Sequence, residues 1–303
     1  MKVVVTGATG LIGGALVDAL RERGDDVAIL SRNPAATTQL LGGPVDPYTW
    51  SDPQHEFAPA DAFAGADAVV HLAGEPVDQR WSDGAKRRIR DSRELGTRNL
   101  VAGIAAADPP PRTLVSASAS GYYGPHGDER VSEDAPPGHD FLADVVTRWE
   151  REAKAAEDFG VRVVTMRTGV VLSPDGGALT KMLTPFKLGV GGPLAGGQQY
   201  MPWIDLDDVV GGYLFALDTQ RASGPINLSA PEPVTNMHFS QALGRALGRP
   251  AVAPVPAFAV RALYGEMATI VLNGVRMVPK RLEDLGYAFR RPDLDAALAA
   301  ATA

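Results

Sequence analysis

The sequence predicts an α/β fold built on a doubly wound parallel sheet, followed by a smaller C-terminal α/β lobe. Three observations predict it. The chain opens with a β-branched run that breaks into a glycine-rich turn, strand and helix patterns alternate to about residue 172, and glycine and proline cluster beyond Ser173. Alternating strands and helices indicate a parallel sheet covered by helices on both faces. We therefore predict one domain over residues 1–172, to which the chain returns around 203–228, and a smaller lobe over 173–303.

The first 30 residues contain a strand, a glycine turn, a helix and a second strand. Val3 to Val5 suit a strand buried on both faces, and apolar residues then recur at helical spacing from Leu11 to Leu20. Gly24 ends this helix, and residues 27–30 form the next strand. Glycines in the turn let the backbone approach a pyrophosphate, which the positive end of the helix dipole attracts. This predicts a Rossmann-type dinucleotide site with the contacts Gly7, Thr9, Gly10, Leu11, Ile12 and Gly13.

The end of the second strand indicates which dinucleotide is bound. An acidic residue there would bind a ribose 2′-hydroxyl, whereas a basic one would bind a 2′-phosphate. Ser31 and Arg32 occupy this place, and Asp25 and Asp26 precede the strand at the wrong end of the sheet. We therefore expect NADP rather than NAD, with Ser31 and Arg32 among its contacts. The alternative is that Arg32 is only a solvated loop residue.

Composition narrows the class of protein. The 303 residues carry 29 basic and 36 acidic side chains, giving a net charge of −7 without a long basic block, so we expect no nucleic-acid partner. No apolar run is long enough to cross a bilayer and no signal sequence opens the chain, which favours a cytoplasmic protein without a membrane partner. The absence of cysteine excludes thiolate chemistry, and the five scattered histidines suggest no metal site. Redox chemistry would thus need an organic cofactor.

A third strand over residues 68–72 leads into a run of small residues. Leu72, Ala73, Gly74 and Glu75 follow one another where the carboxyl end of a strand should meet the cofactor. We expect all four to contact it. His71 lies inside the apolar strand, and we interpret it as a hydrogen-bonded structural residue.

A long helix is predicted from Ser82 to Ala107, ended by three consecutive prolines from Pro109. Six basic residues lie along it, and two interpretations remain open: a solvated basic face, or one or two arginines that turn inward toward phosphates. The basic residues are Lys86, Arg87, Arg88, Arg90, Arg93 and Arg98.

The remaining elements follow the same alternation. A strand from Leu114 ends in the run Ser116 to Gly124, a helix spans 141–159, and a strand at 161–167 continues to 168–172, where we expect Val171 to contact the cofactor. Asp205 or Asp207 caps a helix, a short strand lies at 226–228, and helices lie around 238–247 and 258–263. Residues 33–64 are expected to hold a short or irregular helix and variable loop.

These motifs, in this order, resemble the extended short-chain dehydrogenase/reductase superfamily. The glycine turn, the His71–Gly74 strand end, the Tyr123-Gly124 step and Asp207-Asp208-Val209 carry the resemblance. More narrowly, the chain resembles the atypical epimerase-family (YfcH-like) subgroup over essentially its whole length. The marks of the subgroup include Gly74-Glu-Pro76, Arg80-Trp81, Ser92-Arg93, Arg148-Trp149-Glu150, Leu188-Gly-Val-Gly-Gly-Pro193 and Pro279-Lys280-Arg281. The resemblance implies a nucleotide-binding fold with a smaller C-terminal lobe over the cofactor.

The chain departs from the superfamily where its chemistry normally resides. A Tyr-x-x-x-Lys pair is expected on the helix that ends in Glu150, and Leu142 and Val146 hold those positions. The asparagine expected before Gly96-Thr97 is replaced by Arg93, which we include among the cofactor contacts. The departure argues against ordinary sugar epimerase or dehydrogenase chemistry.

Ser118, Tyr122 and Tyr123 are the catalytic candidates that remain at the expected reacting centre. They could hydrogen-bond a substrate carbonyl while the nicotinamide exchanges hydride; alternatively, the tyrosines pack on the cofactor and the serine satisfies backbone groups. Three functions stay open: an NADP-dependent oxidoreductase with an atypical site acting on a small molecule, a nucleotide-sugar epimerase or dehydratase, and a non-catalytic NADP-responsive binding protein.

Overall fold

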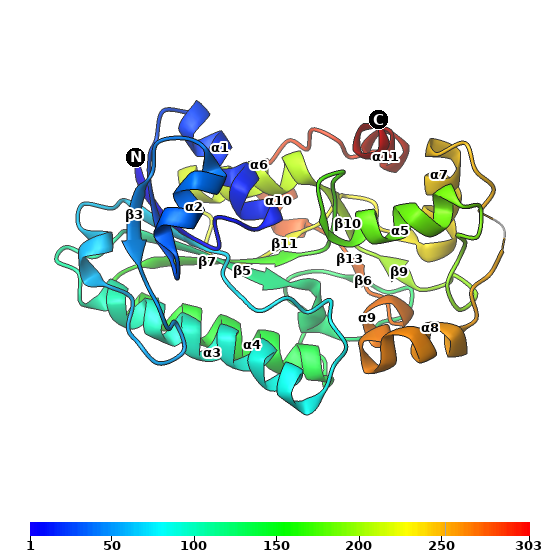
Figure 1. The fold of residues 1–303 in the computed structure, drawn as a ribbon, viewed down its shortest axis with the longest axis horizontal. Coiled ribbons are helices and arrows are strands. Elements are labelled where there is room, and N and C mark those ends of the chain that lie inside the picture. Colours follow the sequence, from blue (N-terminus) through cyan, green and yellow to red (C-terminus); the bar gives the residue numbers. More distant parts are fainter. Residues whose placement is uncertain (252) are drawn as a thin grey trace.

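A parallel sheet of seven strands lies at the centre of the computed structural model, which describes residues 1–251 and 253–303 (Figure 1). The strand order is β11-β7-β5-β4-β1-β2-β3, and each neighbouring pair is parallel. Since the order runs in opposite directions on either side of β1, the sheet has a topological switch point between β1 and β4. The predicted doubly wound sheet is confirmed. Its strands are β1 (Lys2–Thr6), β2 (Asp26–Ser31), β3 (Asp46–Thr49), β4 (Ala68–His71), β5 (Thr113–Ala119), β7 (Arg162–Thr168) and β11 (Gly224–Leu228).

Helices cover both faces of this sheet (Figure 1). One layer holds α1 (Leu11–Glu22), α2 (Pro34–Leu41), α6 (Leu206–Asp218) and α10 (Lys280–Leu285), and the other holds α3 (Asp83–Ala105) and α4 (Phe141–Lys154). Side chains alternate along each strand, so Val3 and Val5 pack in the first layer while Val4 packs in the second with Leu100. This double burial explains the uninterrupted apolar runs in the sequence.

Capping residues set the beginnings of the long helices. Ser82 accepts a hydrogen bond from the Ala85 amide and begins α3, and Asp140 caps α4. Asp205 rather than Asp207 caps α6, which resolves the two predicted alternatives. After α4 the chain tightens into η3 (Ala155–Phe159) before Gly160, where the predicted helix ends.

A smaller lobe, on the right in Figure 1, has its own core around Trp203 and Phe239. Short strands pair within it and at its junction with the main domain: β8 (Val170–Leu172) with β10 (Trp203–Asp205), β9 (Tyr200–Met201) with β12 (Val234–Thr235), and β6 (Arg130–Val131) with β13 (Arg276–Met277). No helix in the described residues is both long and apolar enough to span a membrane. The other elements of the smaller lobe are α5 (Gly177–Lys187), α7 (Asn236–Ala246), α8 (Ala257–Tyr264), η4 (Gly265–Ala268), α9 (Thr269–Leu272) and α11 (Leu294–Thr302).

The structure differs from the sequence-based expectation in two places. Residues 33–64 hold, besides the short α2 and η1 (Ala60–Phe63), the edge strand β3, which was expected to be loop. Pro47 lies in β3 and weakens any strand signal, but an edge strand tolerates it. The chain also returns to the main domain at α10, where Leu282 is buried beside the central sheet. The predicted division had assigned this segment to the smaller lobe.

Candidate functional site

The glycine turn after β1 has the close backbone approach that a phosphate-binding turn needs. A Cβ atom on Gly7 would lie 2.7 Å from the carbonyl carbon of Leu72, and one on Gly13 would overlap the carbonyl oxygen of Gly7. Gly10 begins α1 without any side-chain cap, and Thr9 and Gly10 are exposed. The first amides of α1 therefore lack a side-chain acceptor at the carboxyl end of β1, where they can meet an anion.

A cation, Arg32, follows β2 next to the strand that leads into this turn. The Ser31 hydroxyl is within hydrogen-bond distance of Thr37 and accepts from the Asn33 amide, which shapes the connection into α2. Arg32 is exposed and forms no ion pair with the described part of the chain. Asp25 instead lies at the opposite end of the strand, 2.7 Å from the N-terminal amine. Arg32 is thus free to meet a ligand, whereas Asp25 is not placed to do so.

His71, at the end of β4, is part of the scaffold. Its Nδ1 lies 2.7 Å from the Thr6 hydroxyl and its Nε2 lies 3.0 Å from the Thr97 hydroxyl on α3. Burial, with a smaller contribution from nearby Arg93, lowers the pKa of His71 to about 4, so the ring is neutral at physiological pH. Thr6 also accepts from the amides of Leu72 and Ala73. These contacts fix the strand end that lies against Gly7, in agreement with the structural interpretation of His71.

The loop that leaves β4 is fastened to α3. The Glu75 amide donates to Ser92 (3.0 Å), and the Glu75 carbonyl accepts from Nη1 of Arg93 (2.9 Å). The Glu75 carboxylate accepts from Gln79 and Arg88, and these bonds hold its pKa below the usual value. A Cβ on Gly74 would lie 3.2 Å from the Arg93 guanidinium carbon. The loop therefore places Arg93 directly against its small residues.

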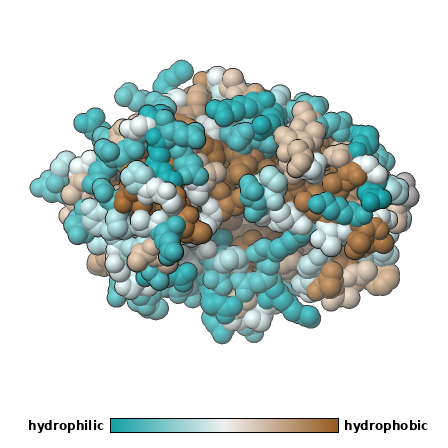
Figure 2. Space-filling model, turned by 45° about the horizontal axis from the view of Figure 1, so that its top comes forward, coloured by the Kyte–Doolittle hydropathy of each residue, from teal (hydrophilic) through white to brown (hydrophobic). Residues whose placement is uncertain are grey.

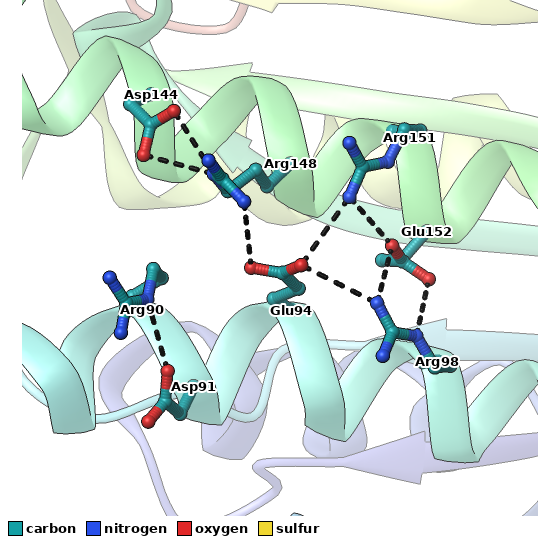
Figure 3. Close-up of polar contacts among 8 residues, drawn as sticks. All are labelled: Arg90, Asp91, Glu94, Arg98, Asp144, Arg148, Arg151 and Glu152. Carbon is teal, nitrogen blue, oxygen red and sulfur yellow. Dashed lines mark hydrogen bonds and ion pairs between the residues drawn. The ribbon is translucent and has the colours of Figure 1, made fainter.

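The basic face of α3 divides between the two predicted interpretations. On the outer side, Arg98 bonds Glu152 and Glu94, and Arg151 and Arg148 of α4 join the same network (Figure 3). Lys86 pairs with Glu266 in the smaller lobe. Arg93 alone among the six points inward, against the ring of Trp149 at 5.0 Å. Most of the face is thus a surface ion network, and one arginine turns toward the candidate site.

The end of β5 holds a buried polar network rather than an open row of donors. Ser118 is 4% exposed and donates to Glu150 at 2.5 Å, and Arg167 of β7 donates to both Glu150 oxygens at 2.8 Å. The hydroxyl of Tyr123, a fully buried residue, donates to Asn227 and accepts from Arg167. Burial raises the pKa of Tyr123 to about 12 despite the nearby Arg167. Sequence reasoning missed this network because its members come from three strands and two helices that are far apart in the chain.

Tyr122 is the catalytic candidate that this network leaves partly exposed. It lies in η2 (Ser120–Tyr123), and its ring lies over Arg167, 3.4 Å from the guanidinium carbon. Leu142 of α4 packs against the same short helix, because a Cβ on Gly121 would be 3.2 Å from that of Leu142. Val146 is buried on the next turn of α4. Apolar side chains of α4 therefore occupy the positions of the usual Tyr and Lys pair in the folded structure too.

The smaller lobe closes over the glycine turn. Gly177 at the start of α5 would place a Cβ 3.3 Å from Leu11, and Val171 and Ile12 lie at the edge of the same apolar core. Lys181 of α5 pairs with Asp78 in the loop after β4. Figure 2 shows one face of the molecule, which is hollowed near its centre with hydrophobic atoms in the hollow. The cofactor contacts predicted from sequence thus gather along one edge of the sheet, where the two lobes meet.

These residues fit a dinucleotide. The turn leaves no room for side chains at Gly7 or Gly13, the first amides of α1 are open, and a free arginine follows β2.

Comparison with known proteins gives matches over the whole chain. Residues 3–229 match the model of the NAD dependent epimerase/dehydratase family, and residues 255–301 match a domain of unknown function, DUF1731. An epimerase family protein of Mycobacterium tuberculosis, MT2273, is 43% identical over 99% of this chain and 97% of its own. The crystal structure of human epimerase family protein SDR39U1 with NADPH superposes with a TM-score of 0.88, at 36% identity, over 100% of this chain and 99% of its own. A Corynebacterium glutamicum nucleoside-diphosphate sugar epimerase gives a TM-score of 0.81 at 35% identity, over 100% of this chain and 58% of its own.

Proposed function

The chain belongs to the NAD dependent epimerase/dehydratase family, and from this premise we propose that it is an NADPH-binding oxidoreductase with an atypical active site. The observation that carries the proposal is the glycine turn at the carboxyl edge of the sheet, whose uncapped amides precede α1, together with Arg32 after β2, which forms no ion pair within residues 1–251 and 253–303. The similar human protein was crystallised with NADPH, which supports the same cofactor here.

The residues divide into contacts for the two halves of the cofactor. The turn from Gly7 to Gly13 holds the diphosphate, and Ser31 and Arg32 hold the adenosine ribose and its 2′-phosphate. Leu72 to Glu75 and Val171 line the path toward the nicotinamide. Bound NADPH supplies a hydride, and the chain binds, orients and shields it.

Calorimetric titration of the purified protein with NADPH and NADH tests the cofactor. We expect NADPH to bind at least about tenfold more tightly, because a charge-assisted hydrogen bond is worth roughly that factor. Arg32→Gln should remove the preference. Arg221→Gln is the matched control, since Arg221 is also exposed but precedes β11 at the opposite edge of the sheet. Equal affinities in the wild type, or an unchanged preference in Arg32→Gln, would refute the assignment.

For the chemical step we propose Tyr122 as the residue that hydrogen-bonds the substrate oxygen. Ser118 and Tyr123 were predicted for this role too, but their hydroxyls are engaged with Glu150 and Asn227 in the interior. In a screen of carbonyl substrates that follows NADPH oxidation, Tyr122→Phe should lower turnover with NADPH affinity intact. Tyr123→Phe should mainly lower the stability of the fold, because the Tyr123 hydroxyl belongs to the buried network. Full turnover in Tyr122→Phe would overturn the assignment.

A non-catalytic NADPH-responsive binding protein is the second candidate. Leu142 and Val146 in place of the usual Tyr and Lys pair favour it, because neither side chain can move a proton. Retained NADPH affinity without turnover of any carbonyl substrate, together with ligand binding that depends on NADPH, would favour this candidate. The same two residues count against nucleotide-sugar epimerase chemistry.

A further inference from the structure

A cluster of apolar side chains lies where the two lobes meet, and neither lobe covers it completely. Its half-exposed members come from three segments, namely the loop after β4, the start of α4, and η4 of the smaller lobe. Two aromatic rings of the cluster, Trp81 and Phe141, meet edge to face with their centroids 5.1 Å apart. This junction cluster consists of the half-exposed Val77, Phe141, Leu142 and Met267 around the buried Trp81, Ile89 and Val145.

The junction cluster adjoins the candidate site from two sides. Val77 follows Glu75, a predicted cofactor contact, by two residues in the loop that leaves β4. Leu142 lies against η2, which carries Tyr122, because a Cβ on Gly121 would be 3.2 Å from the Cβ of Leu142. Strands β4 and β5, which precede these two segments, are neighbours in the sheet. A ligand bound outside the carboxyl ends of these strands therefore meets the junction cluster.

The polar groups beside the cluster are engaged with one another. The indole nitrogen of Trp81 donates to the Val77 carbonyl at 2.9 Å, and the side-chain amide of Gln79 is bonded at both its nitrogen and its oxygen. Lys86 pairs with a carboxylate of η4 and lies 5.3 Å from the centre of the Phe141 ring. None of the four half-exposed side chains of the cluster carries a hydrogen-bond donor. The cluster thus offers a ligand apolar contact instead of hydrogen bonds.

We propose that the junction cluster binds the body of the substrate, and that the substrate is a carbonyl compound with an aromatic or other apolar ring. This inference rests on the proposed function and names the substrate class of that site. A sugar hydroxyl placed against these side chains would lose its water without gaining a partner, whereas a ring packs well on Phe141 and Trp81. In the reduction, the carbonyl carbon gains the hydride of NADPH and the oxygen gains a proton from solvent, so the products are an alcohol and NADP⁺.

Two unreactive amides with the same carbonyl group test the proposal in calorimetric titrations of the protein saturated with NADPH. Naphthalene-1-carboxamide has an aromatic body, and gluconamide has a polyhydroxy body. We expect the naphthalene amide to bind at least about tenfold more tightly, because its ring buries apolar surface and needs no polar partner. The corresponding aldehydes, 1-naphthaldehyde and glyceraldehyde, should follow the same order in kcat/KM, measured by NADPH oxidation. Equal affinities of the two amides, or tighter binding of gluconamide, would overturn the proposal.

Three variants locate the bound ring. Leu142→Asn and Met267→Gln place a polar amide in the cluster at similar size, and each should weaken the naphthalene amide by about fivefold to tenfold. Leu263→Asn is the matched control, since Leu263 belongs to α8 of the smaller lobe, is 67% exposed and lies outside the cluster. This variant should bind the naphthalene amide within about twofold of the wild type. Unchanged affinity in both cluster variants would overturn the proposal.

The melting temperature and NADPH affinity of each variant show that it is folded, and the two wild-type amide titrations decide the matter if a cluster variant does not fold. Preferred binding of the naphthalene amide without turnover of either aldehyde would support the apolar site and overturn the oxidoreductase chemistry of the proposed function. Turnover of glyceraldehyde with little or none of 1-naphthaldehyde would overturn the substrate class and leave the proposed function intact. Failure of the wild type to bind NADPH would overturn both.

Discussion

Replacing Arg167 by Met should destabilise the protein strongly, because Arg167 neutralises a carboxylate inside the domain. Arg167 is 2% exposed and bonds both oxygens of Glu150 at 2.8 Å. Although burial opposes its charge, the bonds to Glu150 hold the pKa of Arg167 above its ordinary value. Removing one partner of a buried pair costs about 3 to 5 kcal/mol, since the other charge is left uncompensated. At about 2 °C per kcal/mol for a chain of this size, the melting temperature should fall by about 6 to 10 °C.

Scanning calorimetry on ligand-free protein measures this loss, and Arg148→Met is the matched control. Arg148 pairs with Asp144 and Glu94 on the surface (Figure 3), where solvent screening leaves such pairs with little effect on stability. A double variant with Leu at position 150 should recover much of the loss, because the stranded carboxylate is gone. If Arg167→Met melted within about 2 °C of Arg148→Met, or the double variant were worse than the single one, the reasoning would fail.

Two further predictions concern the glycine turn and the end of β4. Gly13→Ala should abolish measurable NADPH binding in a titration, because its Cβ would meet the backbone of Gly7 and Ala8; Gly14→Ala should retain binding, since its nearest contact would be an ordinary 3.7 Å. Equal affinities in the two variants would contradict the turn geometry. The pKa of His71 is about 4 in the folded protein and 6.5 in the unfolded chain. The contribution of the neutral ring to stability is therefore complete above pH 6.5 and is lost as the pH falls toward 4. Urea unfolding at a series of pH values measures this effect. Between pH 6.5 and 4, His71→Gln should reduce the slope of the free energy of unfolding against pH by up to about 1.4 kcal/mol per pH unit. An unaltered slope would contradict the assignment of this pH dependence to His71.

Much of the fold could be predicted because its signals are local. A strand buried on both faces must be continuously apolar, as Val3 to Val5 are, and the ends of helices carry capping residues such as Ser82 and Asp140. Edge strand β3 was missed because half of its environment is solvent and its sequence, Asp-Pro-Tyr-Thr, lacks the apolar pattern. The return of α10 to the main domain has no local signal, since only a distant surface makes Leu282 a core residue.

The catalytic candidates show the same limit. The run from Ser118 to Tyr123 marks a strand end in sequence, but alternation along β5 turns Ser118 toward α4, where Glu150 meets it. Tyr123 is engaged by Asn227, more than a hundred residues away in the chain. A sequence motif can identify hydroxyl groups at an edge of the sheet, and only the packing of remote elements decides which of them remain accessible.

By itself, the sequence determined the parallel α/β architecture, the dinucleotide turn and the place of Arg32 beside it, because periodicity, glycine geometry and chain order are properties of short segments. The tertiary structure decided which charges are compensated. Arg93 and Arg98 lie five residues apart on one helix. Arg98 pairs with Glu152 of α4, whereas Arg93 lies against Gly74 and the Trp149 ring and forms no ion pair within the described residues. The free energy of a charge depends on the atoms that surround it in space, and those atoms come from segments that the local pattern does not contain.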